Sequence, residues 1–160
     1  QKLWMARALY KNAPMLLLDE PTANFDVEFR KDFLKLLQEF IADGQKSVVL
    51  ATHLMEDIDR LADYLMYLED GRSIFAGQME DFREQYRIVS GEAYKIKLLD
   101  REDIIAMEQK KYGAKALVRH HGYQHYDTEL TAVPPTVEEF MYFLSKAKTA
   151  ERRNYEKVIH

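Results

Sequence analysis

The 160-residue sequence contains no cysteine, one tryptophan, and only six glycines and four prolines. The lack of cysteine excludes disulfides, thiolate nucleophiles and cysteine-ligated zinc or iron–sulfur sites. So few glycines and prolines exclude a collagen-like or linker-like chain. Hydrophobic residues make up 47% and charged residues 31%, which is typical of an ordinary globular protein.

Long apolar runs and a strong excess of one charge are also missing. The longest apolar stretches, such as 15–18 and 48–51, are far shorter than the ~20 residues that span a bilayer. The chain has 23 basic and 27 acidic side chains and a net charge of -4, with no concentrated basic field. We therefore expect neither a membrane-spanning helix nor a nucleic-acid partner.

The chain begins at Gln1, with no initiator methionine and no basic-then-apolar leader pattern. Residues 2–11 already have apolar side chains at helical spacing, and the pattern breaks near Asn12 and Pro14. We therefore expect a piece cut from a longer protein.

Strand and helix patterns alternate through the first half of the sequence. Residues 15–18 are continuously apolar, which predicts a strand buried on both faces. Asp26 is a candidate N-cap for a helix that runs to Ile41 and stops before Gly44. Further patterns predict a second buried strand over 47–51 and a short helix over 54–61. They also predict a hairpin whose strands, 64–68 and 73–76, are joined by a turn at 69–71. This order predicts an α/β layered sheet.

The net charge changes sign after about residue 86, so we expect a small accessory α/β unit over 87–148 and a fraying polar tail over 149–160. A final helix should begin at Thr136, where Thr136 and Glu139 match a capping box. The remaining patterns predict a helix over 102–111 and strands over 94–99, 115–119 and 126–130.

The strongest chemical motif is MLLLDEPTANFD, residues 15–26. An apolar strand that ends in Asp19 and Glu20 can hold a metal with one carboxylate and activate a water with the other. The alternative is a strand end that is merely solvated. His53 ends the second strand, and the carboxyl ends of parallel strands share one crevice, so His53 should lie beside both acids. The alternative here is a histidine that only caps the following helix.

A second cluster consists of His120, His121 and His125. Three imidazoles within six residues could converge on a metal across the turn at Gly122. A solvated polar turn explains the cluster equally well, and it is the interpretation that we favour.

The segments MARAL, LLLDEPTANFD, ATH and LADYLMYLEDGRSIFAG resemble, in order and approximate spacing, the ATP-binding subunits of ABC transporters. The resemblance covers Gln1 to about Glu84 and extends weakly through VPPTVEEFMYFL. It implies a partial P-loop NTPase (ABC ATPase) fold, an α/β layered sheet in which residues 1–86 are the C-terminal part of the ATPase core. In that alignment the chain begins just after the signature loop.

The resemblance also implies a role for each site residue. Asp19 is similar to the Walker B aspartate that helps to hold Mg²⁺, and Glu20 to the adjacent catalytic carboxylate that activates water. His53 resembles the switch histidine that contacts the γ-phosphate of ATP. Asp26 resembles the aspartate of the D-loop, the short segment that communicates across the dimer of ATP-binding subunits, and the resemblance makes it a candidate cofactor-binding residue. ATP and Mg²⁺ are thus the implied cofactors.

Three family motifs are missing from the 160 residues: the glycine-rich Walker A loop, the glutamine loop and the signature loop. A Walker A loop supplies most of the favourable contacts with a polyphosphate. We therefore expect no ATPase activity and feeble nucleotide binding from these residues alone. We also expect a parallel sheet with an exposed face or edge, and hence self-association.

The implied function is ATP hydrolysis coupled to transport through a separate membrane permease, of the exporter type. The subunit would act with a second copy of the ATP-binding subunit, in the cytoplasm at the inner face of the membrane. Two alternatives remain. One is a non-transport ABC-type ATPase that acts on chromosomes or ribosomes, and the other is a non-enzymatic fragment that binds another protein.

Overall fold

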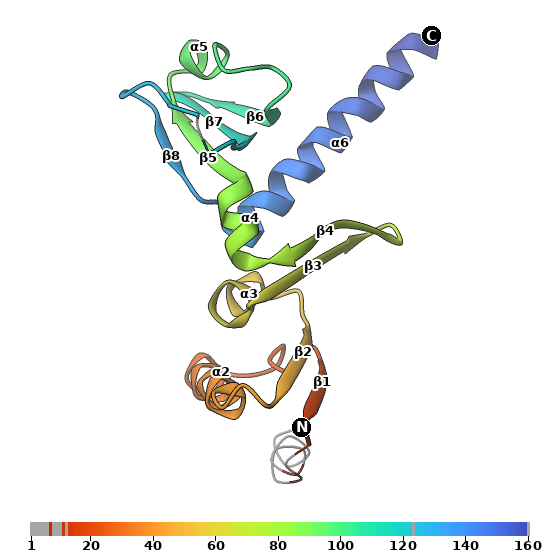
Figure 1. Cartoon of the computed structure of the whole chain (residues 1–160). Coiled ribbons are helices and arrows are strands. Elements are labelled where there is room, and N and C mark those ends of the chain that lie inside the picture. Colours follow the sequence, from red (N-terminus) through yellow and green to blue (C-terminus); the bar gives the residue numbers. More distant parts are fainter. Residues whose placement is uncertain (1–6, 8–10, 12, 123, 160) are drawn as a thin grey trace. The chain divides into compact units, whose positions relative to one another are not determined.

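The structure is a computed structural model that describes residues 7, 11, 13–122 and 124–159, with only the backbone over 151–159. The expected helix over 2–11 lies outside the described residues. The chain forms two compact units, residues 1–62 and 63–160 (Figure 1). No helix in the described part is long and apolar enough to cross a membrane.

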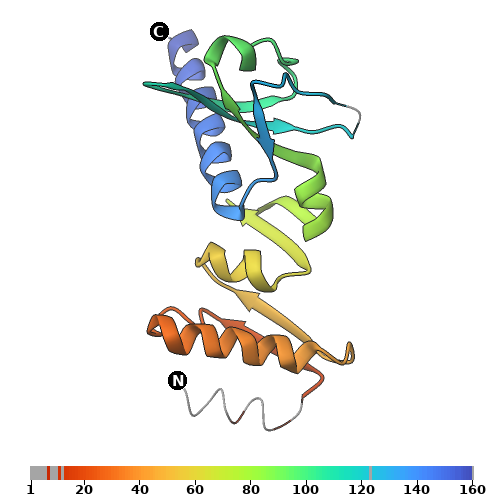
Figure 2. The ribbon, with the colours of Figure 1, turned by 90° about the vertical axis from the view of Figure 1, so that its left-hand side faces the viewer.

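In the described part of the first unit, strands and helices alternate along the chain (Figure 2). Strand β1 (Met15–Asp19) pairs in parallel with β2 (Ser47–Ala51), and helices α2 (Val27–Ile41) and α3 (Met55–Leu61) follow the two strands. The Asp26 side chain accepts a hydrogen bond from the Phe29 amide at 2.9 Å, which confirms it as the cap of α2. After the helix, Gly44 adopts φ +70°, the left-handed backbone expected of a glycine that ends a helix.

The β1–β2 sheet is covered on only one face within the described residues. Leu16 is buried, and α2 buries Phe33, Leu34 and Leu37. Leu17 remains 74% exposed and Val49 53% exposed, so the prediction of strands buried on both faces is wrong. A continuous apolar run shows that both faces can be covered, but it cannot show that a covering layer is present. The expected exposed sheet face is confirmed, whereas self-association stays a prediction.

A hairpin opens the second unit. Strands β3 (Tyr64–Glu69) and β4 (Arg72–Gln78) pair antiparallel, which confirms the prediction. Asp70 and Gly71 at the turn both have positive φ, +50° and +72°, the backbone that a two-residue type I′ turn requires. Helix α4 (Met79–Gln85) follows directly, and the sequence patterns did not predict it.

A four-stranded sheet in the order β6-β7-β5-β8 forms the centre of the second unit. Its strands are β5 (Tyr86–Gly91), β6 (Ile104–Lys110), β7 (Gly113–Arg119) and β8 (Thr131–Val133). Helix α6 (Val137–Ile159) packs on β6 and β7, and the short helix α5 (Ala93–Ile96) packs on β5 and β7. The sheet alternates its buried side chains between these two layers. The α5 side contains Val89, Ile96, Ala116 and Val118.

The opposite layer of this unit is aromatic. The Phe140 ring of α6 lies 5.0 Å from the Phe82 ring and 4.8 Å from the Tyr86 ring, centroid to centroid. Phe82, Phe140 and Phe143 are each no more than 2% exposed. This cluster joins α4, β5 and α6 around one core.

Two predicted elements of the second unit have the wrong type. Residues 94–99, expected as a strand, begin instead with α5, because Ala93, Ile96 and Leu99 at three-residue spacing face the core. Tyr94 and Leu98 are exposed. Residues 102–111, expected as a helix, form β6, because Met107 to Lys110 pair with β7 in an antiparallel hairpin. Cross-strand pairing here overrides the local helical pattern.

The strand expected over 126–130 is wrong in position. The Asp127 carboxylate accepts a hydrogen bond from the Glu129 amide at 2.8 Å, and the Leu130 amide donates to the Asp127 carbonyl at 2.8 Å. Both bonds close a turn, so the strand β8 begins only at Thr131. The strand expected over 115–119 is confirmed as part of β7.

The capping box of the last helix is confirmed. The Glu139 amide donates to Thr136 Oγ1, and the Thr136 amide donates to Glu139 Oε2, both at 3.1 Å. The backbone of α6 continues to Ile159, so 149–159 are helical rather than frayed. Contacts divide the chain after Ala62, whereas the charge change at residue 86 falls where α4 meets β5. The assignment of 1–86, 87–148 and 149–160 to core, accessory unit and tail stays a prediction.

Candidate functional site

The carboxyl ends of β1 and β2 bring the predicted acids and the histidine to one edge of the sheet. Asp19 pairs in register with Ala51, the last residue of β2. The Glu20 amide then donates to the Ala51 carbonyl at 2.8 Å. As a result, Glu20 and His53 leave the sheet side by side, as the parallel pairing predicts.

Glu20 and His53 are in direct contact. Glu20 Oε2 lies 2.8 Å from His53 Nδ1 and 3.4 Å from the Thr52 hydroxyl, which donates to it. The Glu20 side chain is 41% exposed and that of His53 66%, so both remain accessible to a ligand. In the described part of the chain, His53 Nε2 has no hydrogen-bond partner, so this atom is available to contact a ligand.

The backbone of Glu20 is unusual because its φ is +44°. A side chain other than glycine in this left-handed region costs on the order of 1–3 kcal/mol, and such residues cluster at functional sites. Among the described residues, Asp70 in the hairpin turn is the other non-glycine with positive φ. The hairpin turn explains the conformation of Asp70. The conformation of Glu20 changes the direction of the chain directly after β1 ends, at the candidate site.

His53 does not cap the following helix. The Leu54 amide at the start of α3 donates instead to the Thr52 hydroxyl at 3.0 Å. The alternative of a merely capping histidine is therefore wrong. Thr52 holds the start of α3, and the ring of His53 is left to contact Glu20.

Asp19 and Asp26 differ in what they touch. The Asp19 side chain is exposed, and its carboxylate has no partner in the part of the chain that the structure describes. Carboxylate oxygens of this kind suit Mg²⁺, which binds oxygen ligands and keeps several waters. Asp26 is engaged as the cap of α2, so its observed contact is structural. The roles of all four residues in hydrolysis stay predictions.

A buried polar network beside the site was missed at the sequence level. The Thr22 hydroxyl donates to Asp57 Oδ2 at 2.7 Å, and Arg30 Nη2 and Nε donate to Asp57 Oδ1 at 2.7 and 2.8 Å. Thr22 is 1% exposed and Asp57 fully buried. A signal was available, because Arg30 stands three and four residues before Phe33 and Leu34 and so shares the buried face of α2.

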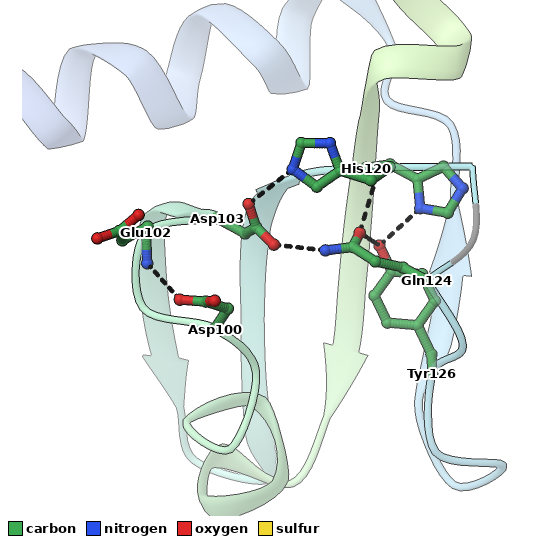
Figure 3. A network of polar contacts seen from close by, with 7 residues as sticks. Asp100, Glu102, Asp103, His120, Gln124 and Tyr126 are labelled. Carbon is green, nitrogen blue, oxygen red and sulfur yellow. Dashed lines mark hydrogen bonds and ion pairs between the residues drawn. The ribbon is translucent and has the colours of Figure 1, made fainter.

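The histidine cluster of the second unit forms a hydrogen-bonded network (Figure 3). Asp103 accepts hydrogen bonds from the His121 ring, at 3.0 Å, and from Gln124, while His120 Nδ1 lies 3.1 Å from the Tyr126 hydroxyl. Burial, aided by the positive charge of Arg87, lowers the pKa of His120, and burial raises the pKa of Tyr126. Among the described residues, no three His, Asp or Glu side chains are placed so that they could hold a metal ion, and the contacts of the cluster are those of a polar turn.

A hollow of about 850 Å³ lies in the second unit, between α5 and the β6–β7 turn. Its lining includes both basic and acidic residues: Lys97, Lys110, Lys111, Glu92 and Glu129. The site at the strand ends is not part of it. The strand ends are the candidate site, because an acid and an imidazole converge there, whereas the lining of the hollow has no such pair.

Comparison with known proteins gives relatives of one kind. The chain is 34% identical to the Nod factor export ATP-binding protein I of Rhizobium johnstonii over 114 residues, 68% of this chain and 36% of that protein. It is 37% identical to the thiamine import ATP-binding protein ThiQ of Chelativorans sp. over 82 residues, 51% of this chain and 33% of that protein. No family model matches the chain.

Among solved structures, a metal-chelate-type ABC transporter in an inward-facing conformation matches 74% of this chain and 44% of that chain, with 20% identity and a TM-score of 0.46. The chain spans about a fifth to just over a third of the length of the curated relatives it matches. Over about half of its length, the chain is homologous to ATP-binding proteins of ABC transporters.

Proposed function

We propose that these residues supply the hydrolytic carboxylates and the switch imidazole of the ATP-hydrolysing subunit of an ABC transporter. The observation that carries the proposal is the 2.8 Å contact between Glu20 Oε2 and His53 Nδ1 at the ends of two parallel strands. The homology to ABC ATP-binding proteins supports it independently.

In this proposal Glu20 orients the attacking water and accepts its proton. As an imidazolium, the ring of His53 donates through Nδ1 to the Glu20 carboxylate and through Nε2 to the γ-phosphate of ATP. Hydrogen-bond donors and positioned water are what phosphoryl transfer requires, because little covalent chemistry falls to the protein.

Asp19 is the proposed holder of Mg²⁺, through a bound water. Its exposed carboxylate at the end of β1 offers the oxygen ligands that this ion prefers. When bound, Mg²⁺ would neutralise part of the negative charge on the phosphates. Asp26 fixes the start of α2 by capping it, and we propose that its loop faces the second ATP-binding subunit of the dimer.

The proposed partners are a membrane permease and a second copy of the ATP-binding subunit, with the protein in the cytoplasm at the inner face of the membrane. The named relatives include one protein for export and one for import. We propose the exporter type, on the extended resemblance through VPPTVEEFMYFL.

The phosphate-binding loop is proposed to come from residues outside these 160, since they contain no glycine-rich loop ending in Lys-Ser or Lys-Thr. Without such a loop, Asp19 and Glu20 repel a polyphosphate. The isolated chain should therefore release no phosphate from ATP above background.

A chimera tests the proposal. The part of the Nod factor export relative that precedes the matched stretch is joined to this chain, and phosphate release is measured with malachite green. We expect Mg²⁺-dependent hydrolysis that falls by roughly 10²–10⁴-fold in Glu20→Gln, the loss typical of removing a general base. Glu28→Gln, an exposed acid in the first turn of α2, is the matched control and should keep full activity. Unchanged turnover in Glu20→Gln would overturn the proposal.

A further inference from the structure

The proposed chemistry makes no use of Asp57, although its carboxylate is fully buried in the first unit. Both of its oxygens are engaged, Oδ2 by the Thr22 hydroxyl and Oδ1 by the Arg30 guanidinium. Arg30 is itself mostly buried, with 22% of its side chain exposed. Its Nη2 also lies 3.6 Å from Glu56 at the edge of the network.

Stability alone does not explain such a group. Removing a carboxylate and a guanidinium from water is costly, and well-packed apolar side chains of similar volume are often equally stable or more so. A hydrogen-bonded ionic network does, however, fix one geometry, because its donors and acceptors fit in only one arrangement. The network therefore indicates a need for exact placement of the segments that it joins.

Those segments are the two that carry the site. Thr22 stands two residues after Glu20, in the loop between β1 and α2, and Asp57 stands four residues after His53, on α3. The loop has few bonds of its own: the Ala23 amide reaches the Glu20 carbonyl at a long 3.5 Å, and the Phe25 amide reaches the Thr22 carbonyl at 3.1 Å. On the other side, the Asp57 amide donates to the Leu54 carbonyl at 3.0 Å, which ties it to the residue after His53.

We propose that Asp57, with Thr22 and Arg30, is a positioning group that holds the Glu20 carboxylate against the His53 ring. Its significance for hydrolysis rests on the proposed function, but the placement itself is a property of the folded first unit. Asp57 touches neither side chain of the pair. It acts through its hydrogen bond to Thr22, which holds the loop after Glu20 against the helix after His53.

The tautomer of the His53 ring reports this placement. An ionised carboxylate only accepts hydrogen bonds, so a neutral ring bonded to Glu20 through Nδ1 must carry its hydrogen there. A free neutral imidazole favours the hydrogen on Nε2. Ring ¹⁵N chemical shifts at alkaline pH measure the ratio of the two forms, and a His53→Gln variant assigns the signals among the five histidines.

The test variant is Thr22→Val, which removes the hydroxyl and keeps the shape of the side chain. We expect the ratio of Nδ1–H to Nε2–H to fall about fivefold, the effect of losing one ordinary hydrogen bond. Thr22→Ser restores the hydroxyl and should restore the ratio. Asp57→Asn should act in the same direction, and Glu20→Ala, which removes the acceptor itself, defines the full loss.

Leu37→Ala separates positioning from stability. Leu37 is 2% exposed in the core of the same unit and takes no part in the network, so this variant should lower the melting temperature without changing the ratio. An unchanged ratio in a folded Thr22→Val protein, or an equal change in Leu37→Ala, would overturn the proposal. An unchanged ratio in Glu20→Ala would also overturn it, because the pair would then not exist in solution.

This measurement needs no nucleotide, so the two proposals can fail separately. A fivefold loss in Thr22→Val with no hydrolysis by the chimera retains the positioning group and rejects the proposed function. Hydrolysis that depends on Glu20, together with an unchanged ratio in Thr22→Val, does the reverse.

Discussion

The two units of the chain achieve order in different ways. The second unit surrounds a four-stranded sheet with apolar side chains on both faces, including three phenylalanines that are almost fully buried. The first unit covers one face of a two-stranded sheet and relies on a buried polar network beside its site. The second unit therefore packs apolar side chains on both faces of its sheet, whereas the described part of the first unit packs only one face and adds a buried ionic network beside the candidate site.

Phe140→Ala should break the comparison most strongly. Phe140 is 2% exposed and contacts Phe82, Tyr86, Phe75 and Tyr67, so its truncation opens a cavity at the centre of the second unit. We expect a loss of about 3–5 kcal/mol in the free energy of unfolding of this unit. Hydrogen exchange followed by mass spectrometry should show the loss in β5, β7 and α6. An equal loss of protection in β1 and β2 would show that the two units do not order separately.

Glu139 should give the second unit an acid dependence of intermediate size. Burial raises the pKa of Glu139, but the Lys115 ammonium and the Thr136 amide outweigh it, so the pKa lies below its ordinary value of 4.5. A depressed folded pKa stabilises the protein above the unfolded pKa, and this stabilisation is lost as pH falls through the folded pKa. Glu139→Gln should therefore cost about 1 kcal/mol near pH 7 and less at a pH below 4.5, where Glu139 takes up its proton. Urea titrations at the two pH values measure it, and an equal cost at both would contradict the assignment.

Leu17→Lys should have the smallest effect on stability and sharpens the description of the first unit. Leu17 is 74% exposed on the uncovered face of β1, so its replacement should change the free energy of unfolding by less than about 0.5 kcal/mol. If that face drives self-association, sedimentation velocity should show a shift from oligomer to monomer. A wild-type chain that is monomeric at every concentration would remove the reason for the variant.

The sequence predicted the first unit better than the second, for physical reasons. The alternation of β1, α2 and β2 and the pairing of Glu20 with His53 follow from apolar runs, a cap at Asp26 and parallel strand ends. The left-handed backbone of Glu20 and the bonds of Asp57 depend on tertiary contacts. The spacing of Arg30 indicates that it shares the buried face of α2, but it does not identify Asp57 as its partner. In the second unit, 102–111 carry a helical pattern, yet their type is decided by pairing with β7, a strand that follows them.

One consequence of the backbone at Glu20 concerns the cost of binding. This residue has φ +44° and directly precedes Pro21, whose ring disfavours helical backbone in the residue before it. The backbone at Glu20 and Pro21 therefore has few alternative conformations to sample. If Glu20 has its proposed role, the backbone that carries this acid is already ordered before a nucleotide binds, and binding need not order it.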